Sequence, residues 1–80
     1  LVSSAKDARI SLNLSGLLIG DSNISDINFS HSVSGQTIYI IGIAENDSEL
    51  NNVLNHARTI QGVKKVVSHI ILKNDPIRKN

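Results

Sequence analysis

Three histidines offer this 80-residue chain its widest choice of chemistry, because imidazole ligates metals and moves protons near neutral pH. His56 falls in an expected helix, whereas His31 and His69 fall in expected strands. No two of them stand four residues apart, the spacing that places two ligands on one helix face. The chain has no cysteine, which excludes disulfides and thiolate zinc sites. The sequence therefore predicts neither a metal site nor a cofactor.

Serines are frequent, but none stands in the Gly-x-Ser-x-Gly turn that presents a nucleophile. The glycines form no phosphate-cradling loop of the P-loop or dinucleotide type. A triad assembled from distant residues needs a substrate cleft, for which so small a domain leaves little room. We therefore expect a binding or assembly domain, not an enzyme.

Positive charge is the remaining chemical feature. The formal net charge is only +1, too small for a dedicated nucleic-acid binder. From Ala57 onward the only anion is Asp75, and the cations are Arg58, Lys64, Lys65, Lys73, Arg78 and Lys79. Each cation near an anionic surface contributes about 1 kcal/mol. Lys64, Lys65 and Lys73, together with the two tail residues, are therefore candidates for such a contact, with a solvated strand end as the alternative.

The first element that must position charged residues is a helix. Ser4 is a candidate N-cap, and Asp7 follows it in the capping-box position. Apolar residues recur at helical spacing and form one stripe: Ile10, Leu14, Leu17 and Leu18. The residues off this stripe include Lys6, Arg9, Leu12 and Asn13. We expect the helix to end near Leu18, with Gly20 as its stop.

A two-stranded hairpin is expected next. Ile27, Phe29, His31 and Val33 alternate with polar residues, the period of a half-buried strand. Residues 34–36 contain the glycine that a tight turn needs. Residues 37–43 are nearly all apolar, which predicts a central strand covered on much of both faces. Gly42 within this strand indicates a bulge or a close backbone approach.

The second helix shows the cleanest apolar stripe. Asn46 is a good N-cap, and Glu49 completes a capping box. The stripe consists of Leu50, Val53, Leu54, Ala57 and Ile60. At about 1.5 to 3 kcal/mol for each large apolar side chain buried, it is the main contact that holds the helix on the sheet. Gly62 ends the helix.

Residues 64–72 form the last expected strand, and Pro76 stands soon after its end. A strand, a helix and a further strand normally make a crossover between parallel strands. The predicted fold is therefore α+β with the order αββαβ. It consists of one three-stranded mixed sheet with both helices packed on one face.

This ordered set of features resembles the BON domain, the module named for bacterial osmotically induced and nodulation proteins. The resemblance rests on Gly35 before an apolar strand, Gly42 within it, the helix over 48–61, and Gly62-Val63-Lys64-Lys65-Val66 before the last strand. The family's αββαβ fold agrees with the order read from the residues. Residues 6–73 would form the domain, with 1–5 as an N-terminal flank and 74–80 as a tail or linker. Ser68 departs from the family, which often has Asn there.

The resemblance implies a non-enzymatic module, periplasmic or associated with the outer membrane. Such a module binds anionic phospholipid membrane or anchors a larger protein at the cell envelope. The implied partners are an anionic phospholipid surface and other envelope proteins or a second BON copy, but no nucleic acid. Similarity to lipid-binding relatives points to the first helix, with the candidates Lys6, Arg9, Leu12 and Asn13. A cation beside an exposed leucine suits such an interface, and a solvated helix face is the alternative.

The alternative function is of a different class, namely a protein-interaction or ring-assembly module of an envelope or secretion complex. In that case an exposed strand edge would pair with another chain. An RNA-binding domain of similar size is disfavoured, because Phe29 and Tyr39 are the only aromatic residues and no Gly-x-x-Gly loop is present.

Overall fold

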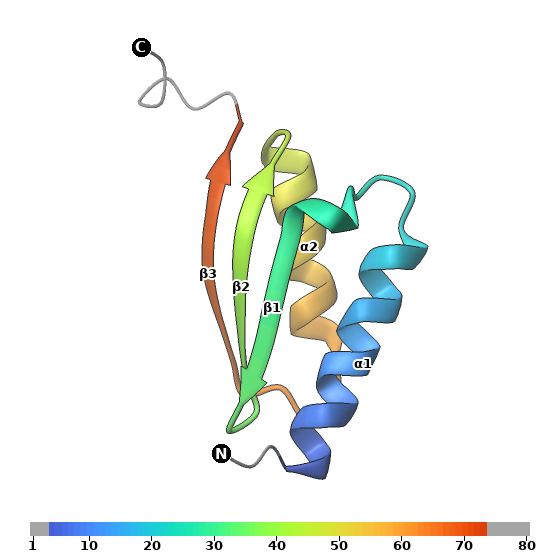
Figure 1. Ribbon diagram of the computed structural model, residues 1–80, viewed down its shortest axis with the longest axis vertical. Helices are drawn as coiled ribbons and strands as arrows, with labels where there is room; N and C mark the ends of the chain where they lie inside the picture. The colour runs from blue at the N-terminus through green and yellow to red at the C-terminus, as the bar shows by residue number, and fades with distance from the viewer. Residues whose placement is uncertain (1–3, 74–80) are drawn as a thin grey trace.

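A computed structural model describes residues 4–73 and contains the expected elements in the expected order (Figure 1). The elements are α1 (Ala5–Gly20), the short 3-10 helix η1 (Asp26–Asn28), β1 (Phe29–Ser34), β2 (Thr37–Ala44), α2 (Asp47–Thr59) and β3 (Lys65–Leu72). The predicted α+β class and αββαβ order are confirmed. Residues 1–3 of the predicted flank, and the predicted tail with Arg78 and Lys79, lie outside the described residues.

The mixed sheet has the order β1-β2-β3, so β2 is its central strand. β1 and β2 form an antiparallel hairpin in which Phe29 pairs with Gly42. β3 runs parallel to β2, and Lys65 lies beside Thr37. α2 therefore carries the chain from the end of β2 back to the start of β3. As a result, the start of α1, the β1–β2 turn and the start of β3 lie at the same end of the molecule (Figure 1).

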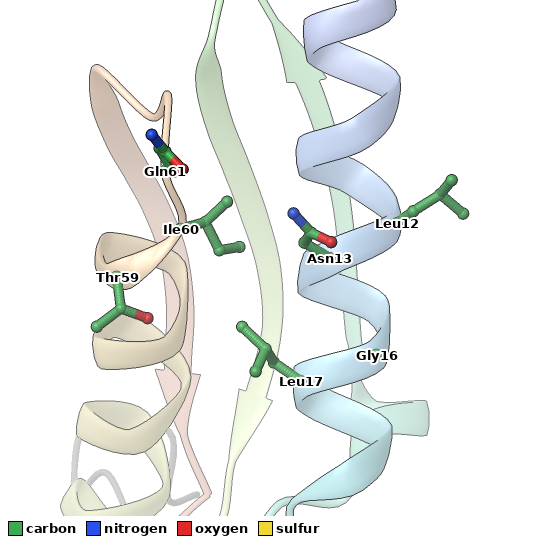
Figure 2. A pocket seen from close by; sticks show the side chains of 7 residues that line it. All are labelled: Leu12, Asn13, Gly16, Leu17, Thr59, Ile60 and Gln61. Atoms are coloured by element: carbon green, nitrogen blue, oxygen red, sulfur yellow. The ribbon is translucent and has the colours of Figure 1, made fainter.

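The hydrophobic core lies between the sheet and the two helices. Its fully buried side chains are Leu14 of α1, Ile38 and Ile40 of β2, and Val53 of α2. The stripe predicted on α1 is confirmed for Ile10, Leu14 and Leu18, which are all buried. Leu17 is 37% exposed, because its side chain points into the gap between α1 and α2 and not toward the sheet (Figure 2).

The stripe on α2 packs onto the sheet as predicted. Val53, Ala57 and Ile60 are buried, Leu50 packs against the core, and Leu54 is half-buried. The helical residues end at Thr59, before the predicted end at Gln61. A glycine with φ of +94°, Gly62, reverses the chain toward β3.

Gly42 lies where the chain before and at the start of β1 comes too close to β2 for a side chain, as its place in an apolar strand predicted. A Cβ atom on Gly42 would lie 2.7 Å from Cδ1 of Phe29 and would also press on the β1 backbone. The Phe29 ring is buried and belongs to the core. Only a residue without a side chain fits beside it.

The sheet is covered on one face only, so the prediction that β2 is covered on both faces was wrong. Tyr39, Ile41 and Ile43 point away from the helices, and each is between 42% and 61% exposed. Both helices lie on the other face (Figure 1). The open sheet face carries Tyr39, Ile41, Ile43, Val67 and Ile71 together with His69, and Ser30 and Ser32 of β1 lie on the same face. A continuous apolar strand is thus consistent with either a buried or a free second face.

The first strand begins later than predicted. Ile27 belongs to η1 and is 88% exposed, instead of facing the core. The Asn28 N–H donates to the Ser25 carbonyl at 3.0 Å, so the chain makes a 3-10 turn before it becomes extended. Ile24, which precedes this turn, is buried and belongs to the core. The alternation of the strand starts only at Phe29.

Asp7 joins the start of α1 to the β1–β2 turn, and does not close a capping box. Ser4 caps the helix as predicted, since its Oγ accepts the Asp7 N–H at 3.1 Å. The buried Asp7 carboxylate accepts the N–H groups of Gly35 and Gln36 at 3.0 and 2.8 Å. Both turn residues have positive φ, +57° and +62°, which aims their N–H groups at the carboxylate.

Glu49 makes an equivalent connection at the start of α2. Asn46 caps the helix as predicted, and its side chain accepts the Glu49 N–H at 2.9 Å. The buried Glu49 carboxylate accepts the N–H groups of Ser25 and Glu45 at 2.7 and 2.6 Å. The Glu49 carboxylate thus joins the loop before η1 to the β2–α2 junction. Hydrogen bonds to a charged acceptor are stronger than those between neutral groups.

Candidate functional site

Four exposed cations occupy one end of the molecule. Lys6 and Arg9 lie in the first turns of α1, and Lys64 and Lys65 lie at the start of β3. Figure 1 places these two segments at the same end, which we call the basic end. Lys73 does not share it, because it follows the far end of β3, roughly 26 Å along the strand. There its Nζ is 3.5 Å from Oε1 of Glu45.

Most carboxylates of the described residues lie toward the opposite end. Asp26 is in η1, Glu45 follows β2, and Asp47 and Glu49 are in the first turn of α2. These segments lie together in Figure 1, away from the basic end. Asp7 is the carboxylate at the basic end within residues 4–73, and it is bound to the turn. A net charge of +1 therefore conceals a strong separation of charge along the molecule.

The outward side of α1 carries two large apolar side chains. Leu12 is 74% exposed and Ile19 is 68% exposed, seven residues apart and so on one side of the helix. Figure 2 shows Leu12 pointing away from α2. Within residues 4–73, no helix combines the length and the apolar character that crossing a bilayer requires.

Three of the candidate residues predicted on α1 line a common cleft. Lys6, Arg9 and Asn13 form one wall, and Gln61 with Gly62 forms the other, enclosing about 470 Å³. Periodicity placed the first three off the core stripe, but Gln61 and Gly62 arrive from the α2–β3 loop. No local pattern in the sequence indicates that this loop reaches α1.

Two of the three histidines, His31 and His56, make contacts that join elements of the fold. Nε2 of His31 lies 3.1 Å from Oγ of Ser11 and 3.5 Å from Oγ of Ser15, which ties α1 to β1. His69 is exposed on the open sheet face. Among residues 4–73, no group of three or more His, Cys, Asp or Glu side chains is arranged to hold a metal ion.

His56 and Asp21 connect α2 to the residue that follows α1. Nε2 of His56 is 2.8 Å from Oδ2 of Asp21. This hydrogen bond is the largest cause that lowers the pKa of Asp21 below its ordinary value of 3.8. The next is a hydrogen bond that the Asn23 N–H donates to Oδ1 of Asp21 at 2.9 Å. The contact therefore favours the ionised carboxylate.

Replacing His56 with alanine is expected to raise the pKa of Asp21 toward 3.8, because the hydrogen bond to His56, the largest cause of the lowering, disappears. Since the pKa of Asp21 is lower in the folded than in the unfolded chain, the contact stabilises the fold above pH 3.8. That stabilisation is lost as the pH falls through the lowered pKa. NMR titration of the Asp21 carboxyl carbon in both proteins measures the shift, and an identical pKa in the variant would contradict this assignment.

Two comparisons with known proteins bear on the chain as a whole. Residues 6–74 match the family model of the BON domain. The chain is also similar to an uncharacterized protein in the gshII 5′ region of Anaplasma centrale, with 32% identity over 75 residues. That match covers 94% of this chain and 50% of the Anaplasma protein. The chain thus spans about half the length of the curated relative that it matches.

Proposed function

Because the chain belongs to the BON domain family, we propose that it is a non-enzymatic module that binds anionic phospholipid membranes at a bacterial cell envelope. The family is one of non-catalytic binding modules associated with membrane and phospholipid binding. As part of this proposal, the protein works in the periplasm or at the outer membrane. The contact surface consists of the basic end and the outward side of α1.

The single observation that carries the proposal is the basic end. Its four cations come from two segments more than fifty residues apart, and they lie far from most of the carboxylates. At about 1 kcal/mol for each cation near an anionic leaflet, together they contribute about 4 kcal/mol at low salt. The carboxylates at the opposite end are repelled by the same surface, so the molecule approaches it with the basic end first.

The exposed leucine of α1 supplies the apolar part of the contact. Leu12 lies one turn from Arg9, so the leucine side chain enters the acyl region while the guanidinium stays with the phosphates. Burying one leucine contributes about 1.5 to 3 kcal/mol. The attachment is therefore reversible and depends on the charge of the lipid.

Sedimentation with lipid vesicles tests the proposal. We expect the protein to bind vesicles that contain phosphatidylglycerol at about 10 mM salt, where the screening length is about 30 Å. Binding is expected to be lost at about 1 M salt, where that length is about 3 Å. Vesicles of phosphatidylcholine alone are the control. Absence of binding to the anionic vesicles at low salt, or equal binding to both lipids, contradicts the proposal.

The open sheet face favours a second candidate function, association with another envelope protein or with a second BON domain. Its exposed isoleucines are Ile41, Ile43 and Ile71, and sheets with apolar faces pack about 10 Å apart in sandwiches. β3 also has a free edge within the described sheet, which suits pairing with another chain or assembly into a ring. Half of the Anaplasma relative lies outside the match, a length sufficient for a further domain. The two surfaces are separate, so such a module can hold a partner while it rests on a membrane.

A further inference from the structure

The middle of the open sheet face is apolar and carries no ionised side chain of Asp, Glu, Lys or Arg. Tyr39, Ile41 and Ile43 of β2 and Ile71 of β3 are all exposed there. The serines of β1 that share the face add only hydroxyl groups. Covering these side chains with a second apolar surface therefore removes apolar area from water without stripping water from a charge.

The size of the face limits the partner that it suits. Alternate residues of β2 from Thr37 to Glu45 point to this side, so the face is roughly 26 Å long and, with three strands, about 14 Å wide. That footprint is smaller than the roughly 800 Å² that each partner buries in a standard interface. It fits a small partner with a face of similar outline, in a reversible complex.

The charges at the two ends of the face favour one orientation of such a partner. Lys65 lies beside Thr37 at the basic end, whereas Glu45 directly follows β2 at the other end. Most carboxylates of the described residues lie toward that second end (Figure 1). Two copies of this chain that stack with their strands antiparallel therefore bring the basic end of each beside the carboxylates of the other.

The side chains of the face match one another in this antiparallel arrangement. Ile41 is midway between Thr37 and Glu45, so a two-fold axis across the strands at this point places Ile41 on its own copy. The same axis places Tyr39 over Ile43 of the second copy. Apolar residues of β3 likewise meet apolar residues of β3, and serines of β1 meet the polar edge of β1. A patch that is self-complementary in this way is the requirement of a symmetric dimer.

A hollow on the face provides room for the interlocking of two such surfaces. It has a volume of about 280 Å³, and its lining includes Tyr39, Ile41 and His69. An isoleucine side chain of the second copy enters it when the two faces approach. Interlocking side chains are the usual packing between stacked sheets.

The other symmetric arrangement, with the two-fold axis parallel to the strands, fits the face poorly. It would place Glu45 against Glu45 of the second copy, and like charges that face each other repel. It would also place the β1 edge over β3, so that Ser32 covers Val67. Charge and polarity thus both favour the antiparallel arrangement.

We propose that two copies of this chain form a symmetric dimer through the open sheet face, with the strands antiparallel and with Ile41 and His69 at the two-fold axis. This inference rests on the second candidate function, in which the open sheet face holds a protein partner, and it identifies that partner as a second copy. Because the face is small, we expect a dissociation constant of about 100 µM.

Analytical ultracentrifugation from about 10 µM to about 1 mM protein measures the dimer by mass action. Ile41→Lys places two like charges face to face at the axis, and we expect it to weaken the dimer about tenfold or more. Ile19→Lys is the matched control, because it makes the same change at an equally exposed isoleucine of α1, away from the sheet. Its dimer is expected to form as in the parent. Thermal unfolding checks that both variants fold.

Cross-linking through single cysteines tests the orientation and does not depend on Ile41→Lys. The chain has no cysteine of its own, so each variant carries one thiol. At the axis, two copies of His69→Cys face each other across the gap of about 10 Å between stacked sheets, which a short bismaleimide spans. We expect this variant to form a covalent dimer. Lys65→Cys is the control, because its two thiols would lie about 26 Å apart along the strands.

Each outcome bears on the dimer separately from the membrane function. A dimer that Ile41→Lys weakens and Ile19→Lys retains, together with cross-linking of His69→Cys alone, supports the proposal. A monomer up to about 1 mM, equal dimers in both lysine variants, or equal cross-linking of both cysteine variants overturns it. Vesicle binding by a protein that stays monomeric rejects the dimer alone. Dimerisation of a protein that ignores anionic vesicles supports the dimer and rejects the membrane function alone.

Discussion

Replacing Lys65 with glutamate is expected to weaken binding to phosphatidylglycerol vesicles about 30-fold, whereas Lys73→Glu leaves it unchanged within about twofold. The first substitution changes the charge at the basic end by two units, which at about 1 kcal/mol each corresponds to about 2 kcal/mol. Lys73 lies beyond the far end of β3, beside Glu45. Its distance of roughly 26 Å from Lys65 exceeds the screening length of about 10 Å at 0.1 M salt.

The two variants form a matched pair, because they have the same net charge and both substitutions lie at exposed positions, one at the first residue of β3 and one directly after its last residue. Vesicle sedimentation at about 0.1 M salt measures the difference, and thermal unfolding checks that both remain folded. Equal losses of affinity would mean that net charge, and not the basic end, determines the interaction.

Gly42→Ala is expected to destabilise the protein by about 1 to 3 kcal/mol, because the strand has no room for a methyl group. The added Cβ would lie 2.7 Å from Cδ1 of Phe29 and would also clash with the backbone carbonyl oxygen of Asn28. β1 and β2 would have to separate at the start of β1, where Phe29 pairs with Gly42. Such a shift also displaces a buried ring from the core.

Gly16→Ala is the control for this substitution. A Cβ on Gly16, in the interior of α1, meets nothing within 4 Å. Alanine should therefore stabilise the protein there by up to about 1 kcal/mol through helix propensity. Urea denaturation of both variants measures the change in the free energy of unfolding, which is expected to be negative for Gly42→Ala and positive for Gly16→Ala. A Gly42→Ala protein as stable as the parent would contradict the close approach of the two strands.

The parts of the fold that follow from local sequence were predictable. The Asn46 cap and the stripe from Leu50 to Ile60 place α2, and turn and alternation signals place the hairpin. Gly42 predicted a close contact between strands, because a glycine inside an apolar strand indicates either a bulge or a close backbone approach. These signals all act within one element or between sequence neighbours.

The parts that depend on distant contacts were not predictable. Asp7 and Glu49 stand at capping-box positions, yet their carboxylates bind loops that lie more than twenty residues away or across a junction. Ile24 enters the core and Ile27 does not, because a 3-10 turn intervenes before the strand. Hydrophobicity alone does not distinguish two isoleucines three residues apart.

The candidate site shows the same division. Periodicity correctly placed Lys6, Arg9 and Asn13 off the core stripe of α1. It gave no indication that Lys64 and Lys65 lie at the same end of the molecule as Lys6 and Arg9, since that depends on β3 running parallel to β2. The separation of Lys73 from them follows from the same topology. Which cations of a sequence share one surface can therefore be determined only once the fold is known.

The most direct test of the membrane contact is an NMR map of the protein bound to lipid nanodiscs that contain phosphatidylglycerol. We expect the signals of residues 6–13 and of Lys64 and Lys65 to shift or broaden, whereas those of Tyr39, Ile41 and Ile43 stay unchanged. Perturbations confined to the open sheet face, with the basic end unaffected, would contradict it.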